Sequence, residues 1–171
     1  MDIHIRPAEV KDAKGIAIVQ TETWQHAYAG QIPDEYLQAL SVPEKITKWQ
    51  EILSHPKGNA QTFVAEKDGQ VVGFCSVGPR RDTVLPETTG ELWAIYVDKN
   101  HMRGGVGSAL WERGKTYLKE NGYTQATLWV LMSNAKTRKW YESKGWRVEG
   151  KTLIDKKSSV ELHEIRYIID L

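Results

Sequence analysis

The sequence of 171 residues contains one cysteine, Cys75, so an internal disulfide is excluded. A lone cysteine also has no companion at metal-ligand spacing and suits a reducing compartment, so we expect a cytoplasmic protein. Cys75 lies in the apolar run VVGFCSV, which predicts a small core residue rather than a reactive thiol. The five histidines show no metal-ligand spacing either, and we predict no bound metal.

The sequence also lacks an excess of either charge and any long apolar run. Its 23 Lys and Arg residues nearly cancel its 22 Asp and Glu residues, so no broad basic surface for nucleic acid or an anionic membrane is expected. No apolar run approaches the ~20 residues of a membrane span. The first ten residues, MDIHIRPAEV, have no apolar signal-peptide core. We expect a soluble protein that binds neither nucleic acid nor membrane, and its length fits a single domain over 1–171.

Strand and helix periods follow one another along the chain, which predicts an α/β fold with a mixed, twisted seven-stranded sheet and helices on both faces. Asp68 and Gly69 separate two alternating segments and predict a two-residue hairpin turn. The strand at 91–97, the helix at 105–121 and the strand at 126–131 form a βαβ unit, so the two strands should be parallel. Further helices are predicted over 8–24, from an N-cap at Asp34, over 43–53 and over 133–144, and further strands at 3–5, within 61–77, at 146–152 and at 160–169.

The stretch HMRGGVGSA, at 101–109, carries the strongest chemical signal. It follows the apolar strand ELWAIYV and precedes a helical pattern. Its three glycines leave the backbone without side chains at the point where the strand ends and the helix begins. The N–H groups there can converge on one anion at the positive end of the helix dipole. The pattern predicts a pyrophosphate cradle; the alternative is a loop that only turns the chain. The residues are Gly104, Gly105, Val106, Gly107 and Ser108.

Two common phosphate motifs do not fit this loop. A Walker loop needs Lys and then Ser or Thr after its last glycine, whereas SAL follows Gly107 here. The dinucleotide pattern GxGxxG does not match GGVGSA. The sequence therefore favours neither ATP nor NAD.

The run YVDKNHMRGGVGSAL resembles the acyl-CoA loop of the GNAT superfamily of N-acetyltransferases. In that loop a Gln or Arg is followed, after two residues, by Gly, one residue, and Gly or Ala. Gly105 and Gly107 fit this pattern. Met102 stands at the Gln or Arg position, and Arg103 beside it supplies a cation.

A second segment, NAKTRKWYESKGW at 134–146, resembles the family motif in which an Asn is followed seven residues later by a Tyr and then by Gly and an aromatic residue. Lys136 occupies a position that is commonly basic, whereas Thr137 stands where Ala is usual. The distance between the two segments and the order of the predicted elements also agree with the family. The matching residues are Asn134, Tyr141, Gly145 and Trp146.

The resemblance implies a GNAT-like sheet in which the parallel strands at 91–97 and 126–131 are splayed, and a bulge in the first of them opens the cleft where acetyl-CoA binds. The backbone of Ile95, Tyr96 and Val97 would bond the pantetheine arm as an added strand does. Met102, Arg103 and the glycine loop would hold the pyrophosphate, with Lys136 nearby. These residues, with Asn134 and Tyr141, are the cofactor-binding set that the resemblance implies.

Two roles remain open in the second segment. Tyr141 is implied as the general acid that protonates the departing thiolate, and the alternative is an aromatic core residue. Asn134 is either a pantetheine ligand or the N-cap of the helix that follows, and both roles are compatible.

The acceptor side is less well defined by the sequence. An amine with a pKa near 10.4 is mostly protonated at pH 7 and must lose a proton before it attacks. Glu91, at the start of its strand, is the candidate base, directly or through water; the alternative is a strand-end carboxylate in solvent. The resemblance places Trp24, Tyr28 and Tyr36 near an acceptor pocket, although a core role for Trp24 fits equally well.

We therefore expect an N-acetyltransferase that moves an acetyl group from acetyl-CoA to a primary amine by direct attack in a ternary complex. The alternative is a catalytically idle acyl-CoA-binding sensor or regulatory module of the same fold. The expected partner is a small-molecule or peptide amine, and the resemblance makes a homodimer plausible. The pattern does not name the acceptor.

Overall fold

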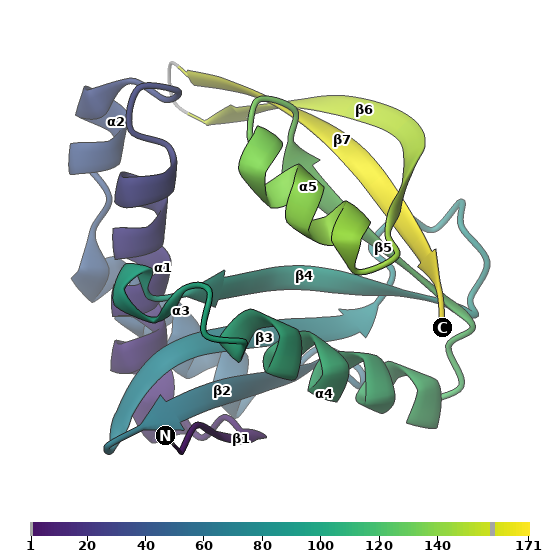
Figure 1. The fold of residues 1–171 in the computed structure, drawn as a ribbon, viewed down its shortest axis with the longest axis horizontal. Coiled ribbons are helices and arrows are strands. Elements are labelled where there is room, and N and C mark those ends of the chain that lie inside the picture. Colours follow the sequence, from purple (N-terminus) through teal and green to yellow (C-terminus); the bar gives the residue numbers. More distant parts are fainter. Residues whose placement is uncertain (1, 158–159) are drawn as a thin grey trace.

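The computed structural model describes residues 2–157 and 160–171, and its strands form one sheet of order β1-β2-β3-β4-β5-β7-β6 (Figure 1). β4 and β5 are parallel, and the other neighbouring pairs are antiparallel. The strands are His4–Pro7 (β1), Gln61–Lys67 (β2), Gln70–Pro79 (β3), Thr89–Val97 (β4), Gln125–Leu131 (β5), Arg147–Lys157 (β6) and Val160–Asp170 (β7). The α-helices are Ala13–Ala27 (α1), Asp34–Gln38 (α2), Val42–Ser54 (α3), Val106–Glu120 (α4) and Ala135–Ser143 (α5). Short 3₁₀ helices cover Val10–Asp12 (η1) and Lys99–His101 (η2).

Helices cover both faces of the sheet, as predicted, because side chains along a strand point alternately to opposite sides. Phe63 and Cys75 of neighbouring strands face α4 and join the core beneath it. Val64 and Phe74, the next residues along, face α1 and α3. Figure 1 shows α1 to α3 at one side of the sheet, with α4 and α5 in front of it.

The glycine in α1 has a packing reason. A Cβ on Gly15 would lie 2.8 Å from Cβ of Val71, so a larger residue would force the helix away from β3. This close approach offsets the ~1 kcal/mol that glycine costs in a helix interior. In place of the single helix predicted over 8–24, the structure has two successive helices, η1 and α1.

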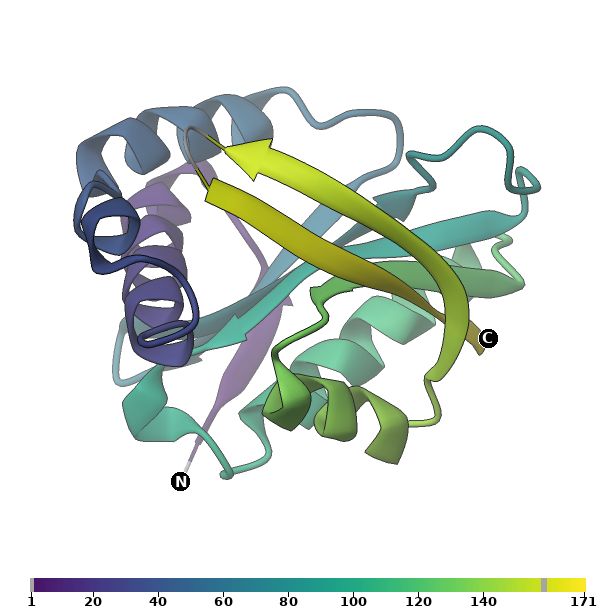
Figure 2. The ribbon, with the colours of Figure 1, turned by 90° about the horizontal axis from the view of Figure 1, so that it is seen from above.

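A third apolar cluster joins the α1–α2 segment to the start of β7. Tyr28, Ile32 and Leu37 pack there against Leu131 and Leu162. Figure 2 shows β6 and β7 arching over the sheet toward this helical end. Asp34 is the first residue of α2 rather than its N-cap, which is Pro33, so that detail of the sequence prediction was wrong.

The two parallel strands diverge. β4 and β5 share only the pairs Thr89–Gln125, Gly90–Ala126 and Glu91–Thr127. Beyond Glu91, β4 remains paired with β3 alone, and Trp93 is the extra residue of a bulge in that ladder. Figure 1 shows β4 and β5 separating from the right of the view toward its left. The predicted splay is confirmed, and it exposes one backbone edge of β4.

Other predictions about the elements are confirmed, with boundaries shifted by a few residues. Asp68 and Gly69 form the hairpin turn with φ values of 50° and 77°, the left-handed conformation that a two-residue turn matching the strand twist needs. Cys75 is fully buried, and burial raises the pKa of its thiol. Within the described residues, no helix is long and apolar enough to cross a membrane.

Candidate active site

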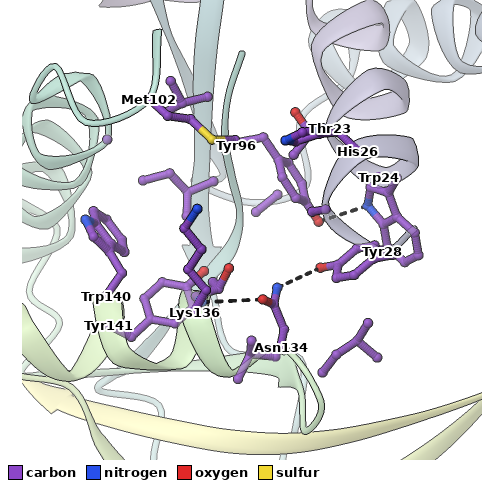
Figure 3. A pocket seen from close by; sticks show the side chains of 18 of the residues that line it. Thr23, Trp24, His26, Tyr28, Tyr96, Met102, Asn134, Lys136, Trp140 and Tyr141 are labelled. Carbon is purple, nitrogen blue, oxygen red and sulfur yellow. Dashed lines mark hydrogen bonds between the residues drawn. The ribbon is translucent and has the colours of Figure 1, made fainter. Parts of the chain in front are cut away.

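A cavity of about 810 Å³ lies where β4 and β5 separate. Its walls come from α1 and the loop after it, β4, the turn before α4 and the first turn of that helix, β5, α5 with the loop before it, and β7. Figure 3 shows side chains from these elements converging on it, among them Trp24 and Tyr28 from α1 and Lys136 and Tyr141 from α5. This volume lies within the ~300–1,000 Å³ typical of small-ligand pockets.

The turn before α4 has a backbone suited to an anion. Arg103 has a φ of 65°, which is unusual for a residue with a side chain, and Gly105, the N-cap of α4, has a φ of 83°. The first intrahelical bond runs from Ala109 N to Gly105 O at 3.0 Å, so the amides before Ala109 have no intrahelical acceptor. No heavy atom lies within 4 Å of where a Gly105 Cβ would stand. The space beside Gly105 is therefore open, and a helix N-terminus with unpaired amides is suited to an anion.

The predicted loop residues divide into two groups. Met102, Arg103, Gly105, Gly107 and Ser108 line the cavity, and Ile95, Tyr96 and Val97 line it from β4. Gly104 and Val106 do not line it. Val106 is 4% exposed because its side chain packs in the core beneath α4, so only its backbone is available to a ligand.

Gly107 has a second role, in helix packing. A Cβ there would lie 3.2 Å from Cζ2 of Trp140, so the small residue allows α5 to approach the start of α4. Trp140 also lines the cavity, a contact that sequence reasoning missed. The first turns of both helices thereby border one cavity, and both helix dipoles place positive charge there.

Asn134 and Tyr141 both line the cavity, as does Lys136, which is exposed. Asn134 is the N-cap of α5: its side chain accepts a bond of 3.4 Å from Thr137 N, and its Nδ2 donates to Tyr28 Oη at 3.5 Å. The N-cap alternative is thus realised. The Tyr141 ring packs against Trp146 and Tyr167 and is 7% exposed, so it belongs to the core as well as to the cavity wall. Burial raises the pKa of Tyr141 well above its usual value, which keeps the phenol protonated.

The other end of the cavity is aromatic. Trp24 Nε1 donates to Tyr96 Oη at 3.1 Å, and the Trp24 ring meets the Tyr28 ring edge to face at 4.7 Å (Figure 3). Burial raises the pKa values of both Tyr28 and Tyr96. Tyr36, predicted with them, does not line the cavity; it packs in the α1–α2 cluster instead.

Glu91 does not line the cavity. It is 2% exposed, and its carboxylate accepts bonds from Arg81 Nε at 2.8 Å and from Arg81 N at 3.0 Å. Neither of the two sequence readings, a base at the cavity or a carboxylate in solvent, matches this buried ion pair. Arg81 Cζ also lies 5.9 Å from the centroid of the Trp93 ring, so the pair contacts the residue at the strand bulge.

Sequence reasoning also missed a carboxylate. Glu164 of β7 and Trp129 of β5 line the cavity, as do Gln31 and Ser133, which share a hydrogen bond of 3.0 Å between Oγ and Oε1. That bond joins the α1–α2 loop to the loop before α5. In the sequence, Glu164 lies in an alternating strand where a polar residue is unremarkable.

Comparison with known proteins decides the family. The chain matches the acetyltransferase (GNAT) family over residues 21–146. It belongs to that family and is a GNAT N-acetyltransferase. It is 34% identical to the uncharacterized N-acetyltransferase YuaI of Bacillus subtilis over 133 residues, which cover 77% of this chain and 73% of YuaI.

Solved structures show the same GNAT fold. The PaiA N-acetyltransferase of Thermoplasma acidophilum, in complex with coenzyme A, superposes with a TM-score of 0.77 at 20% identity, covering 100% of both chains. The yncA structure of Salmonella typhimurium, with its cofactor acetyl-CoA, gives 0.73 at 18% identity, covering 100% of this chain and 95% of that one. At these identities the likeness establishes the fold of this N-acetyltransferase and leaves its ligands to be argued from its own residues.

Proposed function

We propose that this N-acetyltransferase transfers an acetyl group from acetyl-CoA to a primary amine by direct attack, with both substrates bound together. The observation that carries the proposal is the cavity between the diverging strands, bordered by the N-termini of α4 and α5. A thioester carrier with a diphosphate and an amide-rich arm needs an anion cradle next to an open strand edge. Both features meet in this cavity.

Each part of the carrier has a counterpart. The amides around Gly105 and Gly107 would hold the pyrophosphate, with Arg103 and Lys136 as nearby cations. The free edge of β4 beyond Glu91 would bond the pantetheine amides, because β5 has left that edge unpaired. Two solved structures of the same fold contain coenzyme A or acetyl-CoA, which agrees with this assignment.

The transfer needs one proton delivered to sulfur and two removed from the amine nitrogen. The amine nitrogen bonds to the thioester carbonyl carbon, the carbon–sulfur bond breaks, and the thiolate takes a proton. Tyr141 is the proposed donor: it lines the cavity and its raised pKa keeps it protonated. The acceptor enters as an ammonium and gives up one proton to solvent before it attacks. The nitrogen loses a second proton as the amide forms, and this proton balances the one that Tyr141 gives to the thiolate. The role of Glu91 as the base stays a prediction. Its carboxylate is paired with Arg81 and does not line the cavity.

Two measurements test the proposal. Isothermal titration should detect acetyl-CoA binding, and a thiol-release assay over a panel of primary amines should detect CoA formed only when an amine is present. Absence of acetyl-CoA binding at millimolar concentration would refute the cofactor assignment. Binding without release on any amine would favour the sensor alternative.

A further inference from the structure

Glu164 is the sole carboxylate among the described residues that line the cavity. It lies on β7, half-buried, opposite Leu131 of β5 and Leu153 of β6. An acidic group inside a cavity built to hold an anionic carrier needs a separate explanation, because it would repel the diphosphate if it lay at the same end.

Strand alternation places Glu164 on the face of β7 that points away from the core under α4 and α5. Ile165 and Tyr167 belong to the core under α4 and α5. Glu164 therefore shares its face of β7 with Leu162, which packs against the α1–α2 cluster around Tyr28. Its negative charge contributes to the raised pKa values of Tyr28 and Tyr96, which agrees with this position.

The charged groups of the cavity are thus separated. Arg103 precedes α4 and Lys136 lies in the first turn of α5, where the helix dipoles are also positive. Glu164 lies toward the aromatic end, whose walls include Trp24, Tyr28 and Trp129. Aromatic faces attract cations, and a carboxylate beside them adds a charged acceptor for ammonium hydrogen bonds.

We propose that Glu164 binds the ammonium group of the acceptor and selects alkylamines that carry no carboxylate next to the amine. This inference rests on the proposed acetyl transfer and names the substrate class. An α-amino acid would bring its own carboxylate toward Glu164, and like charges in a cavity repel. An alkylamine presents the cation together with an apolar stem that suits the aromatic walls.

The test compares Glu164→Gln with the wild type. Gln keeps the size and removes the charge, so the KM for an alkyl monoamine should rise roughly tenfold to a hundredfold, the range of a lost charged hydrogen bond. Acetyl-CoA affinity by titration should stay unchanged. Titration of the amine into protein saturated with CoA should show the same loss without turnover. Glu164→Asp should restore part of the affinity.

Two controls isolate the charge. Glu161→Gln alters a 54%-exposed carboxylate of the same strand that does not line the cavity, and it should leave the KM unchanged. An arylamine, which is uncharged at neutral pH, should show no penalty in Glu164→Gln. The inference is overturned if the alkylamine KM is unchanged, if the arylamine suffers equally, or if α-amino acids are better substrates than alkylamines. A wild type that releases no thiol with any amine would instead refute the proposed function.

Discussion

Gly105→Ala tests the anion cradle, because its expected effects come from the backbone conformation at position 105 and not from a lost side-chain contact. Gly105 has a φ of 83°, and a Cβ there would meet no heavy atom within 4 Å, so an alanine brings strain without a clash. The left-handed conformation costs an L-residue about 1–2 kcal/mol. Each kcal/mol shifts the Tm of a chain of this size by ~2–4 °C, so Tm should fall by roughly 2–8 °C.

Gly122 provides a matched control at the other end of the same helix. It has a φ of 86°, also with no heavy atom within 4 Å of a Cβ, and it does not line the cavity. Gly122→Ala should therefore lower Tm by a similar amount. The two variants should differ in ligand binding alone.

Acetyl-CoA affinity separates the two variants. An alanine that relaxes toward negative φ rotates the peptide groups beside position 105, and losing one charged hydrogen bond to phosphate should weaken binding about tenfold to a hundredfold. Titration calorimetry at constant salt measures this difference. If Gly105→Ala binds acetyl-CoA as tightly as Gly122→Ala does, the cradle does not hold the ligand and the reasoning is refuted.

Three further outcomes are expected. Tyr141→Phe should lower kcat about a hundredfold while acetyl-CoA affinity is kept, since only the acid is removed; undiminished turnover would exclude it as the donor. The hydrogen bonds from Arg6 to Asp12 lower the pKa of that carboxyl below its usual 3.8, so their stabilisation is present above about pH 4 and lost below it. Asp12→Asn should lower the free energy of unfolding by about 1–3 kcal/mol at neutral pH. The Tm values of the variant and the wild type should converge as the pH falls, and a difference that persists at low pH would contradict this. Cys75, fully buried, should resist iodoacetamide in the folded protein and react after unfolding, as mass spectrometry can follow.

Most of the fold could be predicted because its signals are local. The turn at Asp68 and Gly69 depends on two residues that tolerate positive φ, and the helices follow apolar periods. The resemblance implies a bulge in β4, but its place at Trp93 could not be predicted, since it depends on how β3 and β4 pair. Likewise, Gly15 weakens the helical pattern in the sequence, and its reason, the contact with Val71, lies 56 residues away in the chain.

In the candidate site too, the residues that could be predicted are those whose signal is local in the sequence. Residues of the two short motifs, such as Gly105 and Tyr141, do line the cavity because each motif is one continuous turn and helix. Glu91 was placed by its position near the start of a strand, but Arg81, ten residues earlier in the loop between β3 and β4, pairs with its carboxylate outside the cavity. Tyr36 turns into the α1–α2 cluster. Glu164 reaches the cavity because β7 returns beside β5, a pairing that no local pattern encodes.

The polarity of the cavity follows from the topology. α4 follows β4 and α5 follows β5, and helices that follow parallel strands begin at the same edge of a sheet, where ligands bind in open α/β sheets. Both positive helix ends must therefore face the gap between these strands. The aromatic end, where we propose that the acceptor binds, also has walls from α1 and β7, which belong to neither βα unit. Because Glu164 comes from β7 and from neither βα unit, a change there should alter acceptor preference while the carrier end keeps its backbone geometry.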